Sequence, residues 1–159
     1  MVREFHGNEG SIAEYRHAIV VSKYHLSITQ KLLDGALKTL RRSGVPEDNI
    51  DVFWVPGSWE LPTGVQIAAA GDYQAAMVFG CVIRGETTHD QHINTTVSNS
   101  IGRLSVELNL PIGFGLLTCN TMDQAIARSG GDVGNKGVET AEAVLQMVLL
   151  NAEYQKTLT

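Results

Sequence analysis

The chain has 159 residues, of which 43% are hydrophobic and 18% charged, a composition typical of a compact globular domain. Its formal net charge of -5 excludes a general nucleic-acid surface, because phosphate backbones require clustered lysine and arginine. Residues 1–16 are polar and no later segment reaches membrane-spanning length, so we expect a soluble, cytoplasmic, single-domain protein over residues 1–159, with no membrane partner.

Short apolar runs alternate with amphipathic segments along the first half of the chain. A strand is predicted at residues 17–21, followed by a helix for which Ser27 is the candidate cap, with Gln30 three residues further on. A second strand at residues 50–55 stops at a Pro-Gly pair, and a shorter helix then ends near Gly71.

The second half of the chain repeats this alternation. A strand at residues 75–83 runs into a polar loop, and a long helix with an apolar stripe follows. A fourth strand is predicted at residues 112–117 and a short helix at residues 122–129. A glycine-rich loop at residues 130–137 then leads into a final amphipathic helix.

This order is a strand-helix unit repeated four times. Strands separated by helices cannot pair as hairpins, so we expect a parallel sheet with right-handed crossovers and helices on both faces. The predicted fold class is therefore α/β, a single-domain, three-layer α/β/α sandwich with a four-stranded parallel sheet, flavodoxin-like in type. In such sheets, ligands bind beyond the carboxyl ends of the strands.

Aromatic, hydroxyl, carboxylate and imidazole side chains follow the expected strands at that edge. They occupy residues 22–25, 56–60, 84–89 and 118–121. This mixture suits a flat, polar heterocycle that bears hydroxyl groups and lies beside a phosphate. His89 stands where the third loop meets a helix start, which attracts anions, so it is a candidate for proton transfer on a phosphorylated substrate.

Each of these side chains also has an ordinary structural explanation. Tyr24 and Trp59 could pack over the sheet edge, and Glu60 could complement a helix dipole. Thr88 with Gln91 matches a capping box, so the threonines of this loop could serve only to start the helix.

Metal and redox chemistry find little support in the sequence. His89 and His92 are three residues apart, but no further ligands stand at a suitable spacing, so we expect no metal. Cys81 and Cys119 end separate apolar runs without a C-x-x-C spacing, which favours reduced, buried thiols over a disulfide or a redox role.

The glycine-rich segment at residues 130–137 does not match a dinucleotide-binding loop, because it follows a helix and lacks the G-x-G-x-x-G spacing. It could be a flexible connector. Alternatively, Arg128 before it and Lys136 within it could bring cations to a phosphate.

Three motifs carry a family resemblance. Residues 55–62 read VPGSWELP, residues 80–89 read GCVIRGETTH, and QAIARSG at residues 124–130 is followed by GNKG. Together they closely resemble the 6,7-dimethyl-8-ribityllumazine synthases, over nearly the whole chain. That family condenses 5-amino-6-(D-ribitylamino)uracil with 3,4-dihydroxy-2-butanone 4-phosphate in riboflavin biosynthesis. The resemblance implies a transferase that needs neither a metal nor an organic cofactor.

The resemblance also implies roles for the residues that would bind the pyrimidine substrate. Tyr24 and Trp59 would lie around the pyrimidinedione, with Tyr24 stacked on it. Glu60 would hold ribityl hydroxyls and Ser58 would line the same pocket. The pyrimidine edge would be read by the backbone of three residues, Cys81, Val82 and Ile83.

The remaining roles concern the butanone phosphate and proton transfer. His89 matches the proton-transfer histidine, and Arg128 matches an arginine that clamps the phosphate from a neighbouring subunit. Phe114 matches an aromatic residue of that neighbour, and Lys136 would lie nearby. The loop that receives the phosphate contains Glu86 and Thr87.

Some positions depart from the commonest family pattern. Tyr24 stands where phenylalanine is usual, Trp59 where phenylalanine or tyrosine is usual, and His25 where asparagine is frequent. The aromatic-rich continuation after His89 is replaced here by Asp-Gln-His. A protein that stores or carries a flavin or lumazine is the alternative function, and a flavodoxin-like electron carrier is a third, weaker one.

The resemblance implies a homo-oligomer with active sites at subunit interfaces. The family forms pentamers, some of which assemble into decamers or an icosahedral shell of sixty subunits, and riboflavin synthase is a candidate partner. Residues 1–16 are expected to form an arm that packs on a neighbouring subunit.

Overall fold

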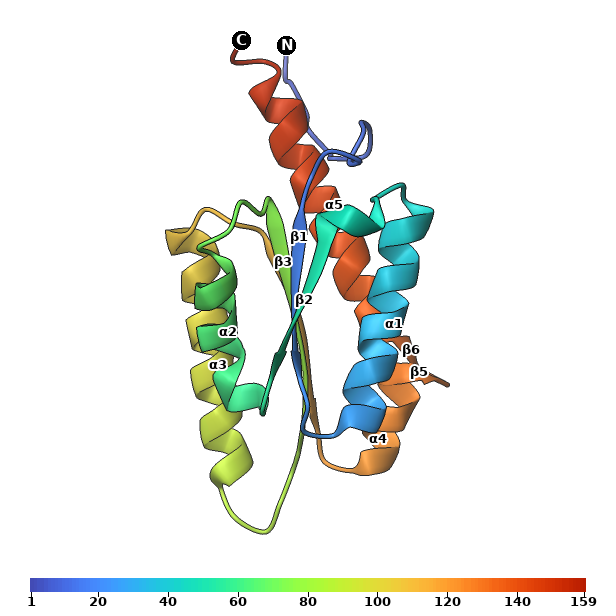
Figure 1. The fold of residues 1–159 in the computed structure, drawn as a ribbon, viewed down its shortest axis with the longest axis vertical. Coiled ribbons are helices and arrows are strands. Elements are labelled where there is room, and N and C mark those ends of the chain that lie inside the picture. The colour runs from blue at the N-terminus through green and yellow to red at the C-terminus, as the bar shows by residue number, and fades with distance from the viewer.

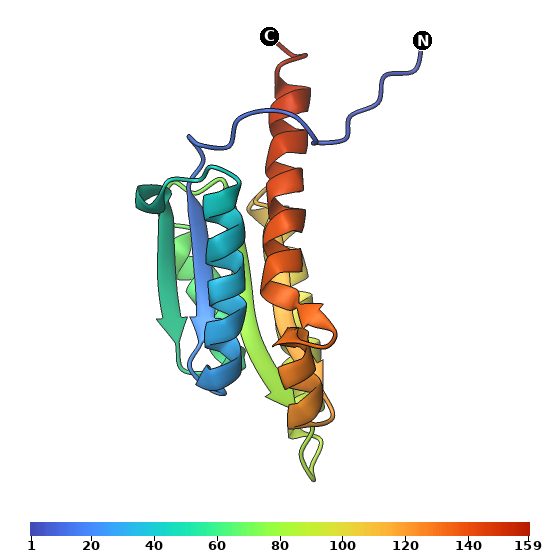
Figure 2. The same ribbon diagram turned by 90° about the vertical axis from the view of Figure 1, so that its right-hand side faces the viewer.

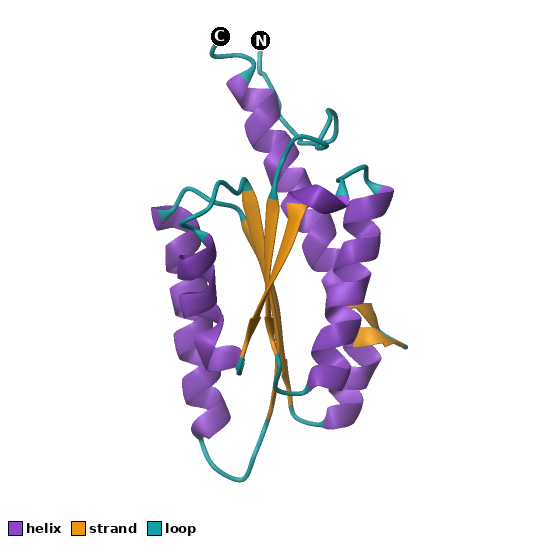
Figure 3. Cartoon of the chain, in the orientation of Figure 1, coloured by secondary structure: helices purple, strands orange, loops and turns teal.

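The computed structural model describes all residues from 1 to 159 and contains one four-stranded sheet with helices on both faces (Figures 1 and 3). Its strands pair in parallel in the order β2-β1-β3-β4. They are β1 (His17–Ser22), β2 (Ile50–Val55), β3 (Ala75–Ile83) and β4 (Ile112–Cys119). The predicted α/β/α architecture is therefore confirmed.

The helices form the two outer layers of the sandwich (Figure 1). One layer contains α2 (Leu61–Ala68) and α3 (His89–Glu107), and the other contains α1 (Leu26–Arg42), α4 (Met122–Arg128) and α5 (Lys136–Gln155). Because helices cover both faces of the sheet, β3 is buried at eight of its nine positions and reads as a continuous apolar run. No helix in the chain combines the length and apolar character needed to cross a bilayer.

The strand register brings all four carboxyl ends to one edge of the sheet. Ser22 pairs with Val55 and Ile83 pairs with Cys119. Backbone hydrogen bonds continue this alignment beyond the strands, since the Tyr24 N–H donates to the Pro56 carbonyl at 3.1 Å, and that of Arg84 to Cys119 at 2.8 Å. The loops that carry the candidate site residues therefore leave the sheet side by side.

The predicted cap of the first helix is wrong. Helix α1 begins at Leu26, so Ser27 lies inside it, and the cap position is His25 in the left-handed conformation (φ 56°, ψ 48°). The Tyr24 N–H still bonds across to the segment that follows β2, so only His25 is left to turn the chain from the sheet into the helix. Because the turn takes a single residue, α1 begins before Ser27.

The predicted capping box at the start of α3 is also wrong. Thr88 occupies the cap position, but its side chain makes no capping hydrogen bond, and the Gln91 N–H donates to the Thr88 carbonyl instead. The Thr88 backbone (φ -83°, ψ 8°) lacks the extended conformation that directs a cap side chain at the helix amides. The Oγ1 of Thr87 accepts a hydrogen bond from the His89 N–H at 3.4 Å.

The glycine-rich segment is a short hairpin rather than a loop. Its strands are β5 (Ser129–Gly131) and β6 (Gly134–Asn135), and α5 begins directly after it. The Asn135 Oδ1 accepts hydrogen bonds from the Gly137 and Val138 N–H groups at 2.7 and 3.3 Å, which caps α5. A flexible connector was one interpretation of this segment, but these hydrogen bonds hold the end of the hairpin against the start of α5.

The hairpin is tied to α1 as well. The Asn135 Nδ2 donates to the Lys31 carbonyl at 3.1 Å. Gly137 lies so close to α1 that a Cβ placed there would be 1.9 Å from the Leu32 carbonyl oxygen. Glycine is therefore required at position 137 for the close approach of α1 and α5.

The N-terminal arm contains no strand and runs across α5 of its own chain (Figure 2). Glu153 accepts hydrogen bonds from the His6 and Gly7 N–H groups at 3.2 and 2.8 Å. The Phe5 ring packs edge-on against Tyr154 with centroids 5.5 Å apart. These contacts hold residues 5–7 against the helix.

Acid is expected to destabilise the fold through His17. This side chain is 0% exposed, neither ring nitrogen has a hydrogen-bond partner, and burial lowers its pKa from 6.5 to about 4. Between these two values the unfolded chain binds a proton that the folded chain does not, so stability is lost as pH falls from 6.5 towards 4. The expected loss is roughly 3 kcal/mol, measured by urea unfolding at pH 7.5 and 4.5.

His17→Leu is the control for this pH effect, because leucine cannot titrate. Its stability should fall less than that of the original chain between the two pH values. Equal losses in both proteins would show that other groups cause the acid sensitivity.

Candidate functional site

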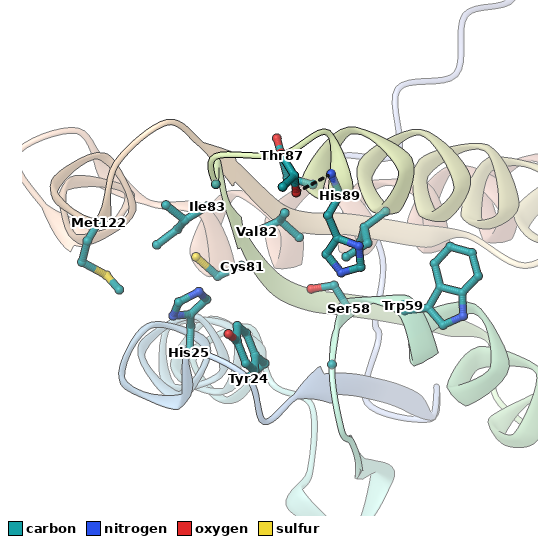
Figure 4. A pocket seen from close by; sticks show the side chains of 14 residues that line it. Tyr24, His25, Ser58, Trp59, Cys81, Val82, Ile83, Thr87, His89 and Met122 are labelled. Carbon is teal, nitrogen blue, oxygen red and sulfur yellow. Dashed lines mark hydrogen bonds between the residues drawn. The ribbon is translucent and has the colours of Figure 1, made fainter.

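A cleft of about 720 Å³ opens at the carboxyl edge of the sheet (Figure 4). Segments that follow β1 and β2, the end of β3, and the starts of α3 and α4 form its walls. Eight candidate residues line it: Tyr24, Ser58, Trp59, Cys81, Val82, Ile83, Thr87 and His89. The other lining residues are His25, Gly57, Gly85, Asp90, Ile93 and Met122.

The aromatic side chains of the cleft are not packed into the protein. Tyr24 is 67% exposed and Trp59 is 54% exposed. Tyr24 contacts the His25 ring edge-to-face, with centroids 4.7 Å apart and planes at 72°. Packing over the sheet edge therefore does not account for these rings, which remain available to stack on a flat ligand.

The end of β3 supplies an apolar floor. Cys81 is buried and its thiol is free, as is that of Cys119, so the predicted reduced thiols are confirmed. Burial and, secondarily, the nearby Cys119 raise the pKa of Cys81 to about 12. The Cys81 thiol is therefore neutral at physiological pH and is not activated as a nucleophile.

His89 is the first residue of α3, as its place in the sequence predicted. Its ring is directed towards Ser58 across the cleft (Figure 4). Ser58 is only 6% exposed, and its buried hydroxyl has no hydrogen-bond partner within the chain. A titratable imidazole thus faces an unpaired hydroxyl, beside helix-start amides that favour an anion.

Glu60 and Glu86 do not line the cleft. The Glu60 Oε2 accepts a hydrogen bond from the Gly57 N–H at 3.0 Å, which fixes the turn that carries Ser58 and Trp59. Glu86 is exposed in the loop between β3 and α3. Glu60 therefore has at least a structural role, and its second carboxylate oxygen accepts no hydrogen bond within the chain.

Three other candidate residues lie away from the cleft. Arg128 and Lys136 line a separate hollow of about 280 Å³ beside β4. Phe114 stands on β4, which is an edge strand, and is 40% exposed. Arg128 donates to the Gln124 carbonyl at 3.1 Å, and Lys136 pairs with Glu139 at 3.1 Å. Within one chain, the cationic side chains of Arg128 and Lys136 therefore do not share a cleft with His89.

Three cleft residues lie outside the segments that the sequence placed at this edge: Asp90, Ile93 and Met122. His25 was expected at this edge, but its left-handed backbone was not, because no local pattern indicated it. Met122 was accessible to prediction, since it starts the helix after the fourth strand and the topology brings that position to the same edge. The chain contains no group of three or more His, Cys, Asp or Glu side chains placed to hold a metal ion.

The chain is similar in sequence to proteins of known activity. Residues 14–152 match the model of the 6,7-dimethyl-8-ribityllumazine synthase family. A 6,7-dimethyl-8-ribityllumazine synthase of Rhodopirellula baltica is 47% identical over 148 residues, which cover 92% of this chain and 96% of that protein. The matched residues 14–152 include the four strands, all cleft residues, and the separate hollow beside β4.

Proposed function

Because this chain belongs to the 6,7-dimethyl-8-ribityllumazine synthase family, we propose that its cleft joins 5-amino-6-(D-ribitylamino)uracil to 3,4-dihydroxy-2-butanone 4-phosphate. The products are 6,7-dimethyl-8-ribityllumazine, phosphate and water, so the protein is a transferase of riboflavin biosynthesis. One observation carries the proposal: an exposed aromatic ring, a buried unpaired hydroxyl and an imidazole share one cleft.

The pyrimidine substrate occupies the aromatic side of this cleft. Its flat ring stacks on Tyr24, beside Trp59, and the backbone of residues 81–83 reads its polar edge. The ribityl chain supplies hydroxyls to the unpaired Ser58 hydroxyl and to the free carboxylate oxygen of Glu60. The rigid turn at residues 57–60 keeps both of these groups in place.

The butanone phosphate binds where β3 meets α3. The positive end of the α3 dipole attracts its phosphate, and the loop with Glu86 and Thr87 approaches it. The Thr87 hydroxyl already bonds the His89 N–H, so loop and helix start form one unit. In this proposal the phosphate leaves next to the imidazole of His89, the first residue of α3.

The reaction consists of proton transfers between two reactants that the cleft holds in register. The pyrimidine amine attacks the butanone carbonyl to form an imine with loss of one water, and phosphate leaves after proton abstraction. The resulting enol becomes a ketone, and the ribitylamino nitrogen closes the second ring with loss of a second water. His89 shuttles the protons, and alignment of the two substrates removes much of the entropic barrier.

The site is completed by a second copy of the chain. Arg128, Lys136 and Phe114 lie beside the β4 edge, away from their own cleft, so they serve the cleft of a neighbour. There Arg128 clamps the phosphate, and Phe114 closes the aromatic pocket. This requires a homo-oligomer, for which we propose the pentamer of the family, with or without an icosahedral assembly.

The proposed pathway also indicates where the enzyme acts and which proteins it meets. We propose a cytoplasmic location, where both substrates are polar metabolites, with riboflavin synthase as the enzyme that consumes the product. Residues 1–4 extend past α5 and are the part of the arm free to contact a neighbouring subunit (Figure 2).

The test is an absorbance assay for lumazine formation from the two purified substrates. Steady product formation without an added metal or cofactor supports the synthase. No product, together with tight binding of riboflavin or lumazine, would instead identify a storage protein on the same fold.

A further inference from the structure

The backbone conformation of His25 is unusual for a histidine. It is one of only two non-glycine residues with a positive φ, the other being Asn109. Glycine and asparagine adopt this left-handed conformation with less strain than other residues. Strained residues of this kind concentrate at functional sites, where a particular side chain is needed.

The backbone contacts of residue 25 do not require an imidazole side chain. The His25 carbonyl accepts the first backbone hydrogen bonds of α1, from Ile28 at 2.9 Å and Thr29 at 3.1 Å. Its side chain makes no capping hydrogen bond. An asparagine or glycine would serve this backbone equally well, so the fold alone does not explain the histidine.

The side chain of His25 instead faces the cleft. It lines the cleft next to Tyr24, and the two rings meet edge-to-face at 4.7 Å (Figure 4). Such pairs prefer a defined relative orientation. Tyr24 is 67% exposed, and the edge-to-face pair with His25 is its only contact with another ring.

We propose that His25 is a positioning residue, which holds the Tyr24 ring with one face open for the pyrimidine of the proposed reaction. A ring that is already ordered loses less conformational freedom on stacking, so the pyrimidine binds more tightly. The butanone phosphate, bound beside α3, gains nothing from this contact. His25 therefore sets the affinity for one substrate only.

His25→Asn tests this role, because asparagine keeps the left-handed backbone and removes the ring contact. The pyrimidine KM should rise about tenfold, while kcat and the butanone phosphate KM change less than about twofold. The Tm should stay equal or rise, since asparagine relieves strain. An unchanged pyrimidine KM, or a loss of kcat with both KM values, would overturn the proposal.

A double-mutant cycle with Tyr24→Ala distinguishes positioning from direct contact. If His25 acts through Tyr24, adding His25→Asn to Tyr24→Ala causes no further rise in KM. A further rise of the same size would mean that His25 touches the substrate itself, and would overturn the positioning role. Asn109→His, at the opposite end of the sheet, is the matched control and should leave the pyrimidine KM unchanged.

Failure of the proposed function would look different. The original chain would then form no lumazine from the two substrates, before any variant is compared. Turnover by the original chain with an unaltered KM in His25→Asn would reject the role of His25 alone.

Discussion

Arg128→Gln is expected to raise the KM for butanone phosphate about 100-fold and to change the pyrimidine KM less than about threefold. Glutamine retains hydrogen-bonding groups but removes the positive charge that we propose faces the phosphate dianion. Steady-state kinetics with each substrate varied in turn would measure both constants. Equal weakening of both substrates would contradict the assignment of Arg128 to the phosphate.

The fold itself should tolerate this change. Arg128 is exposed at the end of α4, and its hydrogen bond within the chain goes to the Gln124 carbonyl. Arg128→Lys is the matched control, because it keeps the charge but loses the planar, two-pronged contact. Its KM for butanone phosphate should fall between those of the original chain and Arg128→Gln.

His89→Ala is expected to lower kcat about 100-fold, at the lower end of the usual contribution of a general acid-base group. The low end applies because His89 is exposed and water can replace it in part. Single-turnover formation of lumazine at saturating substrate would measure the effect on chemistry. Both KM values should change little, since the proposed role of His89 is to move protons rather than to hold a substrate.

His92→Ala provides the control for His89→Ala. His92 is on the same helix, three residues further on, and does not line the cleft. Its kcat should remain close to that of the original chain. A similar fall in both variants would point to damage at the start of α3 rather than to lost proton transfer.

Mixing the two impaired variants tests whether a site is shared between chains. In an oligomer co-assembled from equal amounts of His89→Ala and Arg128→Gln chains, about a quarter of the interfaces pair an intact His89 with an intact Arg128. At a low concentration of butanone phosphate, the activity of the mixture should then exceed that of either variant alone. No recovery in verified mixed oligomers would mean that both residues act within one chain.

The layered fold could be predicted because its signals are local and repeated. The apolar run of β3 and the stripe on α3 identify their elements without any distant contact. The caps and the hairpin could not be predicted in the same way. Tyr24 is held by a hydrogen bond to Pro56, and Asn135 by a hydrogen bond to Lys31. Both bonds join parts of the chain that are far apart in sequence.

The candidate site was predictable to the extent that topology determines it. Parallel strands bring their carboxyl ends together, so Tyr24, Ser58 and His89 were expected in one place, and they line one cleft. The same rule gives no position for Arg128, at the far end of α4. The sequence alone indicated only that Arg128 could serve a phosphate, the family motif assigned it to a neighbouring subunit's site, and its contribution remains a prediction.

The hydrogen bond between Asn135 and Lys31 fixes the distance between the cleft and the hollow beside β4. Helix α1 begins beside Tyr24 and His25, and roughly 8 Å further along its axis Lys31 anchors the hairpin that adjoins Arg128 and Lys136. The cleft residues and the separate hollow with Arg128 and Lys136 are therefore spaced by one rigid helix. In the ring of identical chains that we propose, this fixed spacing would give every shared site the same dimensions without adjustment of flexible loops.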